Sequence, residues 1–205
     1  MPIISMVTRS TKFRWRTIGA VIVLLVNGLA GSSYASESAG VEIRIDAKTS
    51  LTLTTKGHGP FAELVASKRT AVAMGPGTRS ALAHASEFFV VGERSISRSG
   101  RTFFLLITQT PSPGNNRTGY CGSGTEDVLR LLELVDRGTR LVENDKLQLQ
   151  SCLDTLSLSD DTGRTLRRQY EHADPESLGF TWLEHPKFGN VARSLIIEDG
   201  SLSLK

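Results

Sequence analysis

The segment VLRLLELV at residues 128–135 is followed by the turn-forming DRG at 136–138 and by LQLQ at 147–150, and this stretch decides the fold. Apolar and polar residues alternate in LQLQ, as they do along a half-buried β-strand. Two such runs on either side of an Asp-Arg-Gly turn predict a β-hairpin. We therefore expect an antiparallel pair of strands that reverses direction at 136–138.

The same hairpin relates the two cysteines of the chain, Cys121 and Cys152. Paired residues in an antiparallel hairpin have a constant sum of residue numbers, and the cysteines have the same sum as the turn residues Asp136 and Arg137. Bulges would shift this register by one or two residues. Side chains that face each other across such a pair come within disulfide distance. We therefore predict a Cys121–Cys152 disulfide bond, which would stabilise the fold by ~4 kcal/mol in the chain-entropy treatment.

Further strands are predicted on both sides of the hairpin. Alternating residues predict a first pair of strands within 41–54. The apolar runs at 88–91 and 102–108 lack strict alternation, which indicates a pair of strands covered on both faces. The runs at 180–182 and 194–198 are typical of closing strands.

The main helix is expected at residues 61–74, where Phe61, Leu64 and Val65 would share one face. Pro60 suits the start of a helix because its missing N–H is not needed there. The polar segment 165–171 is compatible with a short second helix. The predicted fold class is α+β and mostly β, with a twisted antiparallel sheet and the main helix packed on one face.

Residues 1–35 have the three parts of an export signal. Four basic residues precede the apolar run IGAVIVLLV at 18–26, which fades into small residues up to Ala35. A membrane-spanning helix needs roughly 20 apolar residues, and this run is shorter. We therefore predict a signal peptide cleaved after Ala35, followed by a single β-rich domain at 36–205 in the periplasm or outside the cell. The chain would contact a membrane only through this segment, if it stayed uncleaved.

Removal of the predicted signal changes the charge of the chain. The 205 residues carry a formal net charge of +3 and a sequence pI of about 9.0, but four basic residues and no acidic residue lie within 1–35. The 170 residues that follow therefore have a net charge of −1. Because a nucleic-acid-binding domain needs a basic face, the composition gives no support for a nucleic-acid partner.

The glycine-rich segment GYCGSG at 119–124 does not have the spacing of the known cofactor and catalytic loops. It lacks the third glycine of the dinucleotide-binding G-x-G-x-x-G, and Ser123 has glycine directly on both sides instead of the G-x-S-x-G of hydrolases. Gly124 occupies the position of the nucleophile in the papain-like C-G-[SA]-C. We interpret the segment as a turn that leads Cys121 into a strand, and we expect no cofactor.

The titratable residues form no metal motif along the sequence. The four histidines are too far apart for a short-spaced zinc site: His58, His84, His172 and His185. Folding could still assemble a composite site, from His172 with Asp174 or from Glu184 with His185.

Three charged clusters are expected on the surface. Glu126 and Asp127 are neighbours in a strand, so their side chains point to opposite faces and cannot act together on one bond. The acidic turn at 160–163 lacks the further ligands of a calcium loop. A set of arginines with helical spacing could meet an acidic partner: Arg164, Arg167 and Arg168. The Asn-Arg-Thr of 116–118 fits an N-glycosylation acceptor, which matters only in a eukaryotic secretory pathway.

These observations favour an exported, non-enzymatic module that binds or inhibits a protein partner in the cell envelope, as immunity proteins do. Two polar loops, at 110–120 and 183–193, could present the contacts. The alternative is a small secreted hydrolase whose site is assembled only by folding, from His58, Ser123, Glu126, His172 and His185. A third interpretation is an envelope subunit that self-associates through a strand edge.

Overall fold

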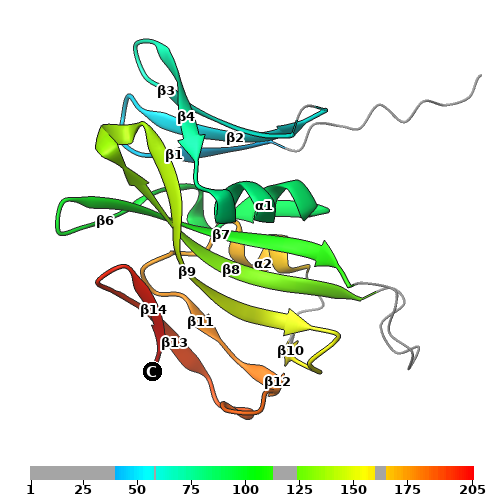
Figure 1. Cartoon of the computed structure of the whole chain (residues 1–205). Helices are drawn as coiled ribbons and strands as arrows, with labels where there is room; N and C mark the ends of the chain where they lie inside the picture. The colour runs from blue at the N-terminus through cyan, green and yellow to red at the C-terminus, as the bar shows by residue number, and fades with distance from the viewer. Residues whose placement is uncertain (1–39, 58, 113–123, 160–164) are drawn as a thin grey trace, which may run out of the picture. The chain divides into compact units, whose positions relative to one another are not determined.

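The computed structural model describes residues 40–57, 59–112, 124–159 and 165–205, and strands dominate these residues (Figure 1). A nine-stranded sheet contains β1 (Gly40–Arg44), β2 (Ser50–Lys56), β3 (Gly59–Val65), β4 (Arg69–Met74), β5 (Glu87–Val90), β6 (Ile96–Arg98), β7 (Arg101–Pro111), β8 (Thr125–Val135) and β9 (Arg140–Ser151). Two small sheets contain β10 (Ser157–Leu158), β11 (Gly179–Phe180), β12 (Trp182–Glu184), β13 (Arg193–Glu198) and β14 (Ser201–Leu204). Two helices, α1 (Pro76–His84) and α2 (Leu166–Tyr170), complete the described part of the chain. The prediction of a mostly β fold is confirmed.

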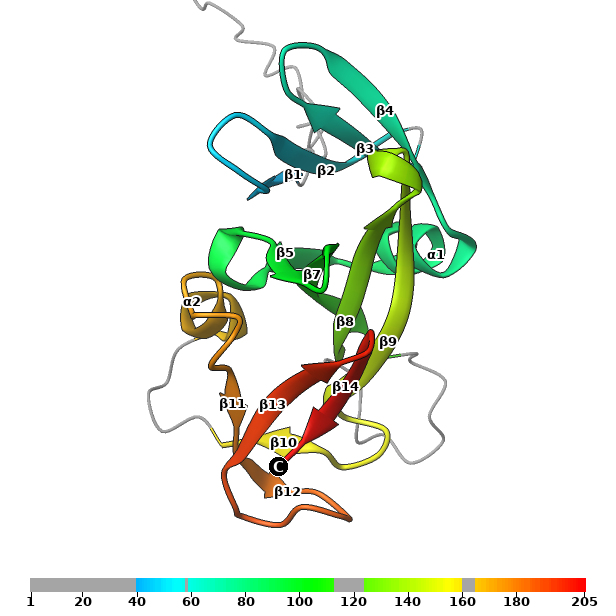
Figure 2. The same ribbon diagram turned by 90° about the vertical axis from the view of Figure 1, so that its left-hand side faces the viewer.

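The large sheet is mixed and curls until its two ends meet at one corner. Its strand order is β1-β2-β3-β4-β9-β8-β7-β5, with β6 also paired to β7. The neighbours are antiparallel except β4 and β9, which are parallel, so the expectation of an antiparallel sheet holds only in part. At the corner the Ser95 backbone N–H donates to the Arg44 carbonyl oxygen at 2.8 Å. Figure 2 shows β1 and β5, the two ends of the sheet, on the same side.

The prediction of a helix at residues 61–74 is wrong, because this segment forms the hairpin of β3 and β4. Ala62 and Val72 are paired across the two strands, and along β4 the buried Val72 and Met74 alternate with the exposed Ala71 and Ala73, which is a period of two and not of 3.6. The turn is closed by a 3.2 Å hydrogen bond from the Ala66 backbone N–H to the Lys68 carbonyl oxygen, without glycine or proline. Phe61, which was expected on the buried helix face, is 46% exposed.

The longer of the two helices, α1, begins where the predicted one was expected to end. Pro76 lies in its first turn, so the proline rule applies here and not at Pro60. Thr78 and Leu82 form its buried face, and Leu82 joins the core enclosed by the curled sheet. The prediction of a short second helix is confirmed by α2.

The predicted β8–β9 hairpin is confirmed, but its register differs from the expected one. Val135 pairs with Arg140 next to the turn, and two bulges follow before Glu126 pairs with Ser151. Cys152 is therefore not brought opposite Cys121 by regular pairing. Instead its side chain lies against Gly124, where an added Cβ would be 2.6 Å from the Cys152 Cβ. Cys121 lies outside the described residues, so the disulfide stays a prediction.

The long strand β7 separates two hydrophobic cores. Phe103, Leu105 and Ile107 face one core, and Phe104 and Leu106 face the other. The second core fills the inside of the curled sheet together with α1, while the first lies under a layer formed by α2 and the strands after it. The prediction of a strand covered on both faces is thus confirmed for 102–108.

Candidate functional site

The structure separates the histidines that the sequence analysis considered. The Nδ1 of His84 lies 2.8 Å from the Ser80 carbonyl oxygen of its own helix. His172 is exposed and its Nδ1 lies 3.5 Å from a carboxylate oxygen of Glu93, so the structure pairs it with that residue. His185 belongs to an aromatic cluster described below. Among the described residues no group of His, Cys, Asp and Glu could hold a metal ion.

The neighbouring acids Glu126 and Asp127 have separate partners, as the strand geometry predicted. A carboxylate oxygen of Glu126 accepts a 2.7 Å hydrogen bond from the Ser112 hydroxyl. Asp127, which was expected on the surface, is instead only 1% exposed, and its carboxylate accepts a 3.0 Å bond from the Gln109 side-chain amide. Burial raises the pKa of Asp127 above its ordinary value, although the hydrogen bond from Gln109 acts in the opposite direction. Both acids are therefore used within the fold.

Arg167 is also used within the fold, where it fastens α2 to β5. Its guanidinium donates to the Phe88 carbonyl oxygen at 3.0 Å and forms ion pairs with Glu87 at 2.6 Å and Glu171 at 3.2 Å. The same group lies 5.5 Å from the centre of the Phe89 ring. Its neighbour in the predicted arginine cluster, Arg168, is exposed.

Several predicted candidates lie outside the described residues: His58, Asn116–Thr118, Gly119–Ser123, Asp160–Gly163 and Arg164. The three described members of the hydrolase set are Glu126, His172 and His185, and the structure gives each of them other partners. The described residues therefore do not assemble the hydrolase site that was considered as the alternative.

A loop at the C-terminal end has the most distinctive surface of the described residues. It includes the last two residues of β12, the connection that follows and the first residue of β13, and it begins beside the fully buried Trp182. The indole Nε1 of Trp182 donates a 2.8 Å hydrogen bond to the Leu149 carbonyl oxygen, which anchors the loop to β9. We call residues 183–193 the aromatic loop.

Ring contacts pack the aromatic loop against Trp182. The His185 and Phe188 rings are 4.2 Å apart, and each also packs against Trp182, with ring centres 5.1 and 5.4 Å away. The Lys187 backbone N–H donates to Nδ1 of His185 at 3.0 Å, so the remaining proton of the neutral ring is on Nε2. Burial, with the nearby Lys187 charge, lowers the pKa of His185. Arg193 lies 5.8 Å from the centre of the Phe188 ring.

Two aliphatic side chains project from this rigid base into solvent. Leu183 and Val191 are each 55% exposed, the highest values among the large hydrophobic residues of the described chain. The side-chain amide of Asn190 faces the carbonyl oxygens of Trp182 and Leu183, which links the two legs of the loop. The apolar groups are therefore displayed by a loop that is tied at its base, so little conformational freedom would be lost on binding.

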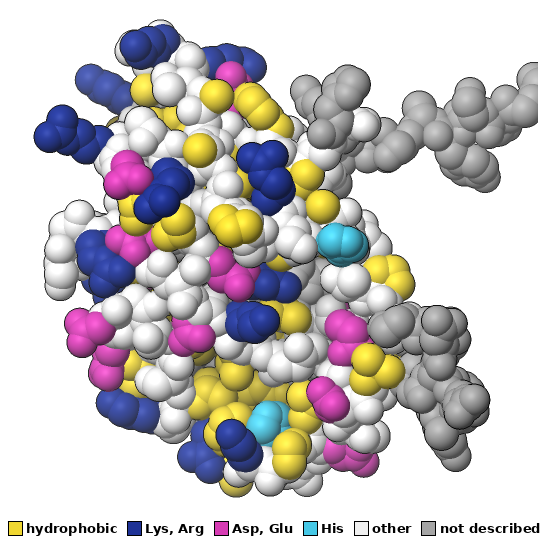
Figure 3. All heavy atoms as spheres, in the orientation of Figure 1, with side chains coloured by type: hydrophobic (Ala, Val, Ile, Leu, Met, Phe, Trp, Pro, Cys, Tyr) yellow, Lys and Arg dark blue, Asp and Glu magenta, His cyan; other side chains and the backbone are white. Residues whose placement is uncertain are grey.

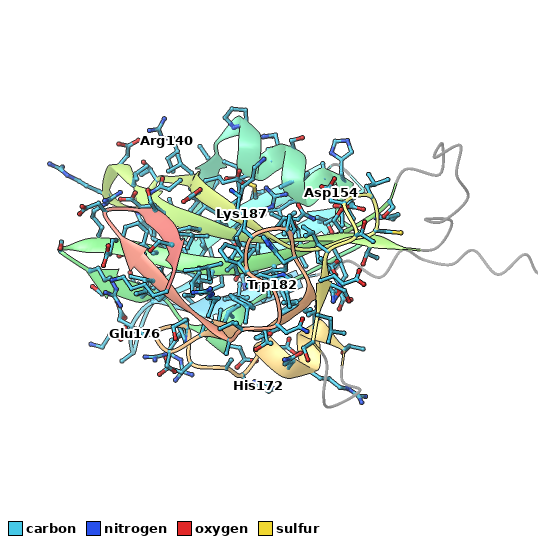
Figure 4. The ribbon with its side chains drawn as sticks, turned by 90° about the horizontal axis from the view of Figure 1, so that it is seen from below. Arg140, Asp154, His172, Glu176, Trp182 and Lys187 are labelled. Atoms are coloured by element: carbon cyan, nitrogen blue, oxygen red, sulfur yellow. The ribbon has the colours of Figure 1, made fainter. Side chains whose placement is uncertain are left out.

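A shallow hollow of about 240 Å³ lies beside the aromatic loop. Its lining combines Phe188 with residues of β9 and β14: Asp145, Lys146, Leu147, Leu202, Ser203 and Leu204. Asp145 accepts a 2.7 Å bond from the Leu202 backbone N–H, which holds β14 against β9. Figure 3 shows hydrophobic side chains gathered over the C-terminal strands, with Lys and Arg beside them, and Figure 4 shows Trp182 and Lys187 from below.

Part of this surface lies on a segment that the sequence analysis singled out. The loop at 183–193 was expected to present contacts, and the structure places exposed apolar groups on it. The role of Trp182 was missed, because its partner on β9, Leu149, is distant in the sequence. The dense aromatic spacing of F-T-W at 180–182 with Phe188 was the available signal.

No protein-family model, curated protein or solved structure matches the chain. In the described part of the chain, no helix is both long enough and apolar enough to span a bilayer.

Proposed function

We propose that the chain is an exported binding or inhibitor module that recognises a protein partner in the cell envelope through the aromatic loop. One observation carries the proposal: Leu183 and Val191 are exposed on a loop whose base is fixed by the buried Trp182. Exposed apolar groups on a rigid base, next to a hollow, are typical of protein-binding surfaces. The Lys187 side chain on the same loop would favour a partner surface that carries carboxylates.

The export part of the proposal rests on residues 1–35. Their basic start, apolar run and small residues before Ala35 have the pattern of a cleaved signal. An exported chain would meet a partner outside the cytoplasm. N-terminal sequencing of the protein from the periplasmic fraction tests this directly, and a start at Ser36 is expected.

The binding part is tested by capture from a cell-envelope extract with protein purified from cells that express the full chain. We expect wild type to retain a partner that the double variant Leu183→Asp, Val191→Asp loses. Phe61→Asp is the matched control, because Phe61 is also exposed, at 46%, but lies on β3. Equal capture by wild type and the double variant would contradict the proposal, as would a failure to capture anything. If the partner is an enzyme, its activity in the complex separates an inhibitor from a neutral binder.

A further inference from the structure

The two end strands of the large sheet are covered to very different extents. At the β5 end, the Arg167 guanidinium donates to the Phe88 carbonyl oxygen at 3.0 Å, and the Gly92 backbone N–H donates to the Glu171 carbonyl oxygen at 2.9 Å. Residues of α2 and its C-terminal end therefore cover this edge. Covering an edge in this way prevents further strands from adding to it.

The β1 end is covered at one position only. Ser95 donates from its backbone N–H to the Arg44 carbonyl oxygen at 2.8 Å, which shows that Arg44 directs its backbone groups away from β2. Because these directions alternate along an antiparallel strand, Glu42 and Gly40 also direct their N–H and C=O groups away from β2. Among the described residues no backbone group pairs with Glu42 or Gly40 on that side.

A hollow of about 640 Å³ lies along this free edge. Gly40, Glu42 and Arg44 of β1 contribute to its lining, together with the turn between β1 and β2. Glu93 and Glu171 contribute from the opposite side, near α2. The free backbone groups of β1 thus border a space that is large enough for a few residues of an extended chain.

The charges around the hollow select the kind of strand that can pair there. Glu93 and Glu171 already have the partners His172 and Arg167, whereas Glu42 has no ion-pair partner among the described residues. Arg44 and Lys48 also line the hollow. A second copy of β1 that pairs antiparallel about Glu42 would place two Glu42 carboxylates opposite each other, which is unfavourable. Pairing about Ile43, which would place Glu42 opposite Arg44, needs the Arg44 carbonyl oxygen that already accepts from Ser95. A basic residue opposite Glu42 is favourable, so a foreign strand fits better than a second copy.

The side chains of β1 define the alternate positions of such a strand. Val41, Ile43 and Ile45 face the core inside the sheet, while Glu42 and Arg44 face outward. A strand added to β1 has its side chains on the same two faces, in register with those of β1. Apolar residues therefore suit the positions next to Val41 and Ile43, and a basic residue suits the position next to Glu42. The added strand begins opposite Ile43, because the Arg44 carbonyl oxygen already accepts from Ser95, so no basic residue lies opposite the Arg44 guanidinium.

We propose that the free edge of β1 binds an extended segment of a partner protein in which basic and apolar residues alternate, by adding this segment as a further strand of the sheet. This is strand addition, in which main-chain hydrogen bonds provide affinity and alternate side chains provide specificity. The site is separate from the aromatic loop, so its failure would leave the function proposed above untouched.

Binding of a short peptide of alternating valine and lysine, measured by calorimetry with protein purified from cells that express the full chain, tests the site. In antiparallel alignment the lysine opposite Glu42 exchanges both hydrogen bonds with it. N-methylation of the lysine nitrogens should therefore weaken binding by about tenfold or more, since it removes these donors. N-methylation of the valine nitrogens is the matched control and should leave the affinity unchanged. Equal affinities for the two methylated peptides, or no binding of the parent peptide, would overturn the proposal.

A charge exchange tests the selectivity. Glu42→Lys should lower the affinity for the valine–lysine peptide and raise the affinity for a valine–glutamate peptide. Glu176→Lys, which changes an exposed residue away from β1, should change neither affinity. Amide exchange of the free protein adds a further test. The Glu42 amide should exchange quickly and become protected when the peptide binds. Slow exchange of this amide in the free protein would overturn the proposal, because the edge would already be paired.

Discussion

The indole Nε1 of Trp182 donates a 2.8 Å hydrogen bond to the carbonyl oxygen of Leu149, a residue 33 positions earlier in the chain. Leu149 is the extra residue of a bulge, because Val128 pairs with Gln148 and Asp127 pairs with Gln150. A bulged residue falls outside the regular ladder, so its carbonyl group needs another donor. Trp182 supplies this donor and thereby connects the aromatic loop to the central sheet.

Trp182→Phe should remove this hydrogen bond while keeping most of the ring packing. The Leu149 carbonyl oxygen would then stay buried without its donor, so the free energy of unfolding should fall by about 1–3 kcal/mol. Trp182→Ala should cost more, about 3–5 kcal/mol, because a cavity is added. Urea unfolding followed by circular dichroism measures both. A Trp182→Phe protein as stable as wild type would show that the bond contributes little.

Arg167→Ala should loosen α2 from β5. The change removes the donor to Phe88 and the partner of Glu87, but the Arg167 side chain is 38% exposed, so water replaces part of what is lost. We expect a loss of about 1–2 kcal/mol in the free energy of unfolding. Arg168→Ala is the control, since Arg168 is exposed on the same helix, and it should be almost neutral. Similar losses for the two variants would contradict this role of Arg167.

Gly92→Ala should be strongly destabilising. Gly92 has a φ of +73°, and a Cβ there would lie 2.6 Å from both the Ala173 carbonyl oxygen and the Pro175 Cδ. Gly100→Ala is a matched control, because Gly100 has a φ of +74° but no atom within 4 Å of the added Cβ. In the control, the free energy of unfolding should fall by about 1 kcal/mol because of the backbone conformation alone. In Gly92→Ala it should fall by about 1–3 kcal/mol more, because the added methyl group overpacks the site. Thermal unfolding of the two variants separates backbone strain from steric overlap. Equal unfolding temperatures for the two variants would show that overlap at Gly92 contributes nothing.

Asp127 should make the fold less stable as the pH rises. Burial raises its pKa in the folded protein, so the folded state holds the proton more tightly than the unfolded state does. The stability contribution of this proton is complete below the unfolded pKa and is lost as the pH rises through the folded pKa. Asp127→Asn keeps an oxygen that can accept the bond from Gln109 and has no proton to lose.

Urea unfolding of wild type and Asp127→Asn at a series of pH values tests this effect. The variant should gain stability relative to wild type as the pH increases from acid towards neutral. If the Asp127 carboxyl group titrated alike in the folded and unfolded states, the difference in unfolding free energy between wild type and Asp127→Asn would not depend on pH. Glu126→Gln is the neighbouring control, because the Glu126 carboxylate is only partly buried.

The predicted Cys121–Cys152 disulfide can be tested by alkylation. Cys152 lies against Gly124, three residues after Cys121 in the sequence, so the two cysteines are within reach of each other. The unreduced, denatured protein should take up no iodoacetamide. The double variant Cys121→Ser, Cys152→Ser should lose about 3–4 kcal/mol of stability. Alkylation of both cysteines without reduction would disprove the bond.

The sequence predicted the elements whose pattern is set by local rules. The β8–β9 hairpin follows from alternation and the turn at Asp136–Gly138, and the polar helix α2 follows from the lack of any strand pattern. The segment 61–74 was misassigned because Phe61, Leu64 and Val65 happen to have helical spacing, while the turn at 66–68 contains neither glycine nor proline. In the structure, tertiary pairing with β2 and β9 decides its conformation.

The finer geometry could not be predicted, for identifiable reasons. The bulges at Leu149 and Asn144 change the hairpin register by one residue each, and no residue type marks them. The contact of Trp182 with Leu149 joins β12 to β9, and only the completed topology brings them together. The polarity of residues 183–193 predicted a contact surface there, but it did not indicate that Leu183 and Val191 would be the exposed apolar groups of this segment.

The position of β7 between two cores has a consequence for the growing chain. Phe103, Leu105 and Ile107 share their core with residues that are synthesised later, including Tyr170, Phe180 and Trp182. Until the ribosome has completed these last segments, the part of this apolar face that they cover is open to other molecules. An unfinished or C-terminally truncated chain is therefore an aggregation hazard and not a smaller working protein, and a chaperone that shields this face would have to remain until synthesis ends.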